Sequence, residues 1–159
     1  MDRLDDEGTD PMVRLWPQRR DRPPKATVWE TLVTFSGIAD RAVELQFDAD
    51  AVICACAQPG ETPPSVAKEA YRVASEYNRL VSWTLDSPAA GSTENLRSEL
   101  ITLLQYHLIM VHHAVRFAFP KYRTEKSEQL RLGMTGLGAM AAELRATREH
   151  IDMLRRQSE

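Results

Sequence analysis

The sequence predicts an all-α protein, a four-helix antiparallel bundle that follows a disordered N-terminal leader. Three observations support this prediction. Apolar residues recur at three- and four-residue steps through most of the chain after residue 26, which places them on one side of a helix. Short Pro- and Gly-containing segments interrupt this pattern, and Ser or Thr precedes several of the apolar runs, where helices are commonly capped.

The composition is that of an ordinary globular domain. Of the 159 residues, 43% are hydrophobic and 27% are charged, so folding is expected, and we assign residues 27–157 to a single domain. A net charge of -3 gives no overall attraction for polyanions. The uncharged run from Leu100 to Val115 is shorter than the ~17 to 25 residues of a spanning helix, so no membrane span is predicted.

Residues 1–26 form the predicted leader. An acidic block is followed there by a basic one, prolines interrupt both, and no apolar period of 2 or 3.6 is present, a composition typical of disorder. The acidic start lacks the basic and apolar regions of a secretory signal. Together with the lack of a disulfide scaffold, this predicts a cytoplasmic protein.

The first helix is expected to begin at Thr27. Glu30 follows at capping-box spacing, so the two side chains can satisfy each other's backbone N–H groups. Apolar residues then recur at helical spacing from Trp29 to Phe47. Residues 50–58 could continue this helix, form a short separate helix or form a strand, because they contain a β-branched pair.

The second and third helices follow two further breaks. Thr62 is the expected N-cap of the second helix, with Pro63 at its first helical position, and its apolar stripe extends from Val66 to Leu85. Ser92 or Thr93 is expected to cap the third helix. That helix is apolar on nearly every side up to the proline at position 120, so we expect the other helices to surround it as the central member of the bundle.

Thr124 is the expected N-cap of a fourth helix, which carries acidic residues in its first turn, where the helix dipole favours them. Apolar residues then follow a heptad-like spacing: Leu130, Met134, Leu137, Ala141, Leu144, Ile151 and Leu154. Gly133, Gly136 and Gly138 weaken the middle of this helix. They predict either a close approach of another backbone or a local break.

Histidines on the third helix are the first candidates for chemistry. His107, His112 and His113 point in different directions at roughly 100° per residue, so one metal ion cannot bind all three. His107 alone lies on the apolar face. A core histidine bonded to a carbonyl or hydroxyl is the favoured interpretation, and a role as metal ligand, base or pH sensor is the alternative.

The two cysteines, Cys54 and Cys56, are the other candidate metal ligands. Zinc sites usually take four ligands from two pairs, and the sequence holds no second pair. We therefore interpret both as small apolar residues, with a redox or metal role completed by a histidine as the alternative. No cofactor is predicted.

Basic residues gather at both ends of the predicted fourth helix. They are Lys121, Arg123, Lys126, Arg131, Arg145, Arg148, Arg155 and Arg156. Phosphate binding is one interpretation. A mixed, solvated face is favoured because glutamates are interspersed among them.

The chain carries no recognisable catalytic motif, so we expect a non-enzymatic interaction or regulatory protein. It would use the exposed edge of the fourth helix to self-associate or to bind a helical partner. The candidate interaction residues are Leu130, Met134, Leu137, Arg145 and Arg148. One alternative is a metal- or cofactor-binding bundle centred on His107, and another is a nucleic-acid-associated regulator that uses the Arg and Lys residues of the fourth helix.

Overall fold

The computed structural model describes residues 27–159, and the predicted leader, residues 1–26, lies outside the described residues. Five helices follow one another: α1 (Val28–Cys56), α2 (Pro64–Asp86), α3 (Ser92–Ala118), α4 (Glu125–Leu132) and α5 (Ala139–Gln157). No strand occurs within this part of the chain. The all-α class is therefore confirmed for residues 27–159, whereas the predicted number of four helices is wrong.

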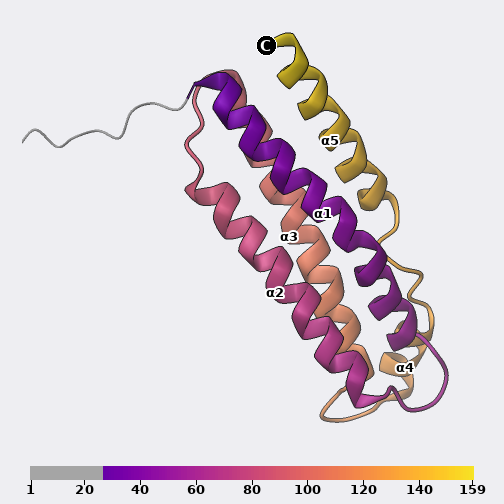
Figure 1. The fold of residues 1–159 in the computed structure, drawn as a ribbon. Helices are drawn as coiled ribbons and strands as arrows, with labels where there is room; N and C mark the ends of the chain where they lie inside the picture. Colours follow the sequence, from indigo (N-terminus) through magenta and orange to yellow (C-terminus); the bar gives the residue numbers. More distant parts are fainter. Residues whose placement is uncertain (1–26) are drawn as a thin grey trace, which may run out of the picture.

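The four long helices lie side by side and alternate in direction, and the short α4 sits at one end of them (Figure 1). α1 and α3 contact each other, and each of them also contacts both α2 and α5. α2 and α5 therefore lie on opposite sides of the α1–α3 pair. This arrangement leaves the outer sides of α2 and α5 without a neighbouring helix among the described residues.

α1 contributes the largest share of the single hydrophobic core. Phe35, Ile38 and Ile53 are each fully buried, and burying an apolar side chain of this size stabilises the fold by about 1.5 to 3 kcal/mol. The buried stripe of α1 continues through Val52 to Cys56. Residues 50–56 are thus a continuation of the first helix, and the strand interpretation is wrong.

Two predicted helix starts are confirmed. The Thr27 hydroxyl accepts a hydrogen bond from the Glu30 amide at 3.1 Å, and the Glu30 carboxylate accepts one from the Thr27 amide at 2.7 Å. Thr124 caps α4 in the same way, with Ser127 as its reciprocal partner. Each capping box satisfies backbone N–H groups that have no hydrogen-bond partner within the helix.

Two other predicted caps are wrong. α2 begins one residue later than expected, with Pro63 as its N-cap, and the Thr62 hydroxyl has no hydrogen-bond partner among the described residues. α3 takes Gly91 as its N-cap in place of Ser92 or Thr93. Gly91 has a φ of 59°, a left-handed conformation that glycine adopts without steric cost.

The predicted fourth helix is broken between α4 and α5. Gly136, in the break, has a φ of 104°, and a Cβ atom there would lie 2.6 Å from the Asp50 Oδ1 atom of α1. The same carboxylate oxygen accepts a hydrogen bond from the Leu137 amide at 2.8 Å. The local break that the glycines predicted is therefore confirmed. The close approach is made by the side chain of Asp50, whereas the glycines predicted the approach of another backbone.

The sequence predicted that the other helices surround α3, and this prediction is wrong. It contacts α1, α2, α4 and α5, yet Ile109 is 49% exposed, and Ile101 and Leu108 are only half-buried. Apolar periodicity overestimated its burial because uncharged residues continue onto a side that no described helix covers. Within residues 27–159, no helix combines the length and the apolar character needed to cross a membrane.

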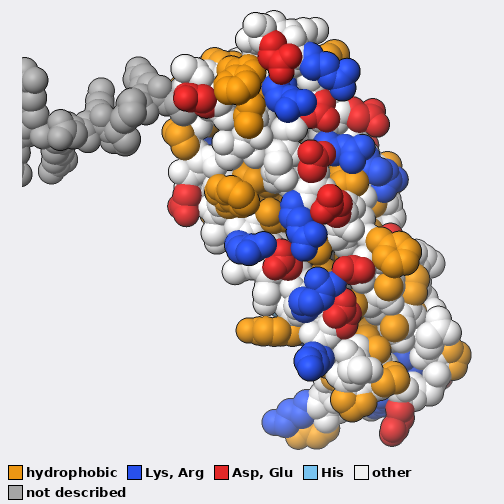
Figure 2. Space-filling view, viewed as in Figure 1, with side chains coloured by type: hydrophobic (Ala, Val, Ile, Leu, Met, Phe, Trp, Pro, Cys, Tyr) orange, Lys and Arg blue, Asp and Glu red, His pale blue; other side chains and the backbone are white. Residues whose placement is uncertain are grey.

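The face formed by α1 and α2 is highly charged (Figure 2). Arg41 of α1 lies 3.6 Å from Glu76 of α2, and Arg72 of α2 lies 2.5 Å from Asp48 of α1. Additional pairs within each helix extend this ladder. Exposed pairs of this kind contribute at most about 1 kcal/mol each, but they make this face unfavourable for apolar contact with another protein.

Candidate functional site

His107 of α3 is fully buried at the centre of a polar network. Its Nδ1 atom lies 2.7 Å from the Leu103 carbonyl, and its Nε2 atom lies 3.0 Å from the Gln46 amide nitrogen. A carbonyl can only accept and an amide NH₂ can only donate. The ring is therefore neutral, with its proton on Nδ1, and burial lowers the pKa of His107 below its usual value.

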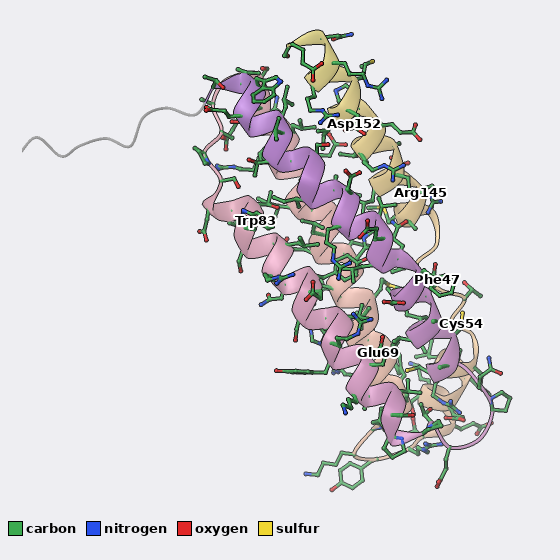
Figure 3. All side chains as sticks on the ribbon, viewed as in Figure 1. Phe47, Cys54, Glu69, Trp83, Arg145 and Asp152 are labelled. Carbon is green, nitrogen blue, oxygen red and sulfur yellow. The ribbon has the colours of Figure 1, made fainter. Side chains whose placement is uncertain are left out.

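The rest of the network connects three helices. The Gln46 amide also donates to the Ala141 carbonyl at 3.0 Å, and Arg145 donates to the Gln46 side-chain oxygen at 2.9 Å. Figure 3 shows Arg145 on α5, beside α1. Both nitrogens of His107 are occupied by these bonds. The geometry matches the favoured interpretation of a bonded core histidine and leaves no free nitrogen for a ligand.

The two cysteines are not brought together. Cys54 is exposed near the end of α1 (Figure 3), whereas Cys56 is buried, and burial raises the pKa of the Cys56 thiol. No cluster of three or more His, Cys, Asp or Glu residues in the described chain could hold a metal ion. The candidate metal ligands His107, Cys54 and Cys56 thus do not form one site here.

Arg131 is buried, contrary to the sequence-based expectation of a basic surface residue. Its guanidinium donates to the carbonyls of Cys56 at 2.7 Å, Gln58 at 2.6 Å and Gly60 at 3.2 Å, and it forms an ion pair with Glu128. Carbonyls at the end of a helix lack partners within it. Arg131 therefore attaches α4 to the end of α1 and is not available to bind phosphate.

The candidate interaction residues of the predicted fourth helix do not lie together on one surface in the structure. Leu130 is 51% exposed, whereas Leu137 is 1% exposed and belongs to the core, so its prediction as a surface residue is wrong. Met134 is half-buried against the core. Arg145 contacts Gln46, and Arg148 lies 3.9 Å from Asp40. These residues do not form a continuous apolar edge.

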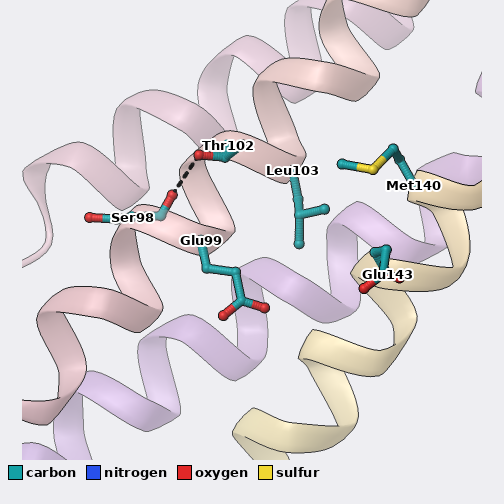
Figure 4. A pocket seen from close by; sticks show the side chains of 6 residues that line it. All are labelled: Ser98, Glu99, Thr102, Leu103, Met140 and Glu143. Carbon is teal, nitrogen blue, oxygen red and sulfur yellow. Dashed lines mark hydrogen bonds between the residues drawn. The ribbon is translucent and has the colours of Figure 1, made fainter.

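A groove of about 480 Å³ lies between α3 and α5 (Figure 4). It is lined by Ser98, Glu99, Thr102, Leu103, Met140 and Glu143. Glu99 accepts a hydrogen bond from the Thr147 hydroxyl at 2.7 Å. Both glutamates are exposed, so water hydrates them, and the groove lacks the desolvation that tunes a carboxylate for acid–base catalysis.

The outer surface of α2 and α3 has a different character. On α2, the residues that pair with α1 lie on one flank of the buried stripe, and at 100° per residue the opposite flank faces α3. We call the combined surface the α2/α3 face. It consists of Tyr71, Ser75, Asn78, Ser82 and Leu85 of α2 and of Ile101, Gln105, Leu108, Ile109 and His112 of α3.

The α2/α3 face contains no Lys, Arg, Asp or Glu. Tyr71 is 77% exposed, Leu85 is 53% exposed and Ile109 is 49% exposed, so its large apolar side chains are accessible. Its serine, asparagine and glutamine side chains can donate and accept hydrogen bonds without a charge to desolvate. Sequence reasoning missed this face because it assigned the whole uncharged run of α3 to the core.

No known protein family, characterised protein or solved structure is significantly similar to this chain.

Proposed function

We propose that this protein is a non-enzymatic interaction module that binds a protein partner through the α2/α3 face. The observation that supports the proposal is the combination, on one face, of exposed Tyr71, Leu85 and Ile109 with a complete lack of charged side chains. The centres of protein interfaces are depleted in charged residues and enriched in aromatic ones. An uncharged, partly apolar face on a small bundle fits that pattern.

The energetics of binding favour the α2/α3 face over the ion-pair ladder of α1 and α2 and over the edge of the predicted fourth helix. Covering an exposed apolar side chain stabilises a complex by roughly 25 cal/mol for each Å² removed from water. The ladder on α1 and α2 would instead lose hydration of its ions on binding, for example at Arg41 and Arg72. The edge of the predicted fourth helix offers less apolar surface than the α2/α3 face because Leu137 lies in the core.

Site-specific photocrosslinking in the native cell tests the proposal. A photoreactive phenylalanine derivative replaces Tyr71, and the matched control carries it at Phe47, which is 80% exposed on the side of α1 away from α2 (Figure 3). We expect a defined covalent adduct from position 71 and none from position 47. Adding the Asn78→Glu substitution introduces a charge into the α2/α3 face and should abolish the adduct.

Two results would contradict the proposal. One is no adduct from position 71 at all. The other is an adduct that forms equally well from position 47 or persists unchanged with Asn78→Glu, since it would not depend on the α2/α3 face.

A further inference from the structure

We infer that the partner of the α2/α3 face is a second copy of this chain, bound antiparallel about a two-fold axis near Asn78. This inference rests on the proposed function and specifies the partner. A two-fold interface requires a surface that is complementary to itself. Both the arrangement of side chains along α2 and the charges at the two ends of the face meet this requirement.

The two large apolar side chains of the exposed stripe of α2 lie symmetrically about Asn78. Tyr71 and Leu85 are the same number of residues away from Asn78, one before it and one after it. The small residues Ser75 and Ser82 lie between Tyr71 and Leu85. Rotation by 180° about an axis through Asn78 places Tyr71 of one copy against Leu85 of the other. The two serine positions leave room for the backbones to approach at the centre, where asparagine can form reciprocal hydrogen bonds.

The charges at the two ends of the α2/α3 face are complementary. Because α2 and α3 are antiparallel, Lys68 of α2 and Arg116 of α3 lie at the same end, and Asp86 of α2 lies at the other. None of these three residues forms an ion pair with another described residue. Glu94, also at the acidic end, is paired with Arg97 at 2.7 Å.

The antiparallel arrangement brings the basic end of each copy to the acidic end of the other. Lys68 of one copy then faces Asp86 of its partner, and the contact occurs twice because of the symmetry. In a parallel arrangement, like charges would meet at both ends, which disfavours that orientation. The end charges thus select the orientation, while the uncharged centre supplies the apolar contact.

The size of the face predicts a weak dimer. The distance from Lys68 to Asp86 along α2 is about 27 Å at 1.5 Å per residue, and two adjacent helices are about 20 Å wide. A flat area of about 500 Å² on each copy lies near the lower limit for specific interfaces. We therefore expect a weak dimer, with a dissociation constant in the micromolar range or higher.

Sedimentation equilibrium of the purified full-length chain over a dilution series tests the inference. The wild-type protein should change from monomer to dimer with concentration. Asn78→Glu places two carboxylates near the axis and should weaken dimerisation at least about a hundredfold. Ala146→Glu, at another exposed helical position on α5, is the matched control and should leave the dissociation constant unchanged.

A charge swap tests the orientation. Lys68→Glu alone and Asp86→Lys alone should each weaken the dimer about tenfold, and the double variant should return to within about threefold of wild type. Circular dichroism verifies that every variant is folded. A wild-type protein that stays monomeric up to 1 mM, equal effects of Asn78→Glu and Ala146→Glu, or a double variant weaker than both single variants would each overturn the inference.

The two proposals fail in distinguishable ways. An adduct from position 71 whose mass is twice that of the chain agrees with both. An adduct with another protein, combined with a monomeric purified chain, would overturn self-association and leave the interaction module standing. Absence of both dimer and adduct would overturn both proposals.

Discussion

Replacing Arg131 by methionine should detach α4 from the end of α1. Methionine fills much of the same volume but cannot donate hydrogen bonds. The carbonyls of Cys56, Gln58 and Gly60 would lose their shared donor, and Glu128 would lose its partner. The structure therefore predicts a loss of stability that no change of a surface arginine would cause.

The magnitude depends on how far water can replace the guanidinium. Cys56 is buried, so its carbonyl stays without a partner, whereas Gln58 and Gly60 are exposed and can be hydrated. An unsatisfied buried acceptor costs about 1 to 3 kcal/mol, and removing one member of a buried ion pair costs about 3 to 5 kcal/mol. Because Glu128 is partly exposed, we expect a total near 3 kcal/mol, which lowers the melting temperature by about 10 °C.

Urea denaturation followed by circular dichroism at 222 nm measures this loss, and thermal melting gives a second reading. Arg131→Lys keeps one charge but loses the planar fork, so its loss should be intermediate. Gln129→Met, on the exposed side of α4, is the control and should change the free energy of unfolding by less than about 0.5 kcal/mol. A loss below about 1 kcal/mol for Arg131→Met would refute the reasoning.

Three further predictions concern the loop, the core histidine and the cysteines. Gly136→Ala should destabilise the protein by about 2 kcal/mol or more in urea denaturation, because residue 136 combines a φ of 104° with a close contact to Asp50. Gly138→Ala, whose added Cβ meets no neighbour, should destabilise it by only about 1 kcal/mol. Equal losses for the two variants would argue against the contact with Asp50. Because burial lowers the pKa of His107 in the folded state, the unfolded chain binds more protons below pH 6.5, so the free energy of unfolding should fall with decreasing pH by up to about 1.4 kcal/mol per pH unit. His107→Gln should reduce that slope near pH 6, above the range in which the carboxylates titrate. An unchanged slope there would contradict this assignment. Iodoacetamide should label the exposed Cys54 in the native protein and the buried Cys56 only after unfolding. Mass spectrometry of the labelled peptides shows which cysteine has reacted, and labelling of Cys56 in the native protein would contradict this prediction.

Local signals in the sequence were sufficient for several features. The caps at Thr27 and Thr124 were predictable because each involves side chains within three residues of the helix start. The burial of His107 was predictable because its neighbours at helical spacing are apolar. The all-α class follows from the same periodicity.

Other features depend on contacts between distant segments. The α2/α3 face could not be predicted because periodicity marks the uncharged sides of a helix but does not show which of them another helix covers. Its uncharged residues belong to two helices, and only their packing brings them together.

The sequence alone therefore determined where α1 and α4 begin, which residues are apolar, and that this part of the chain is all-α. Tertiary structure alone decided that Arg131 is buried, since its carbonyl partners are contributed by residues more than 70 positions earlier in the chain. It also decided that one side of α3 stays open to water. The physical reason is that helix formation depends on neighbours within a few residues, whereas burial and polar satisfaction depend on whichever segment the fold brings alongside.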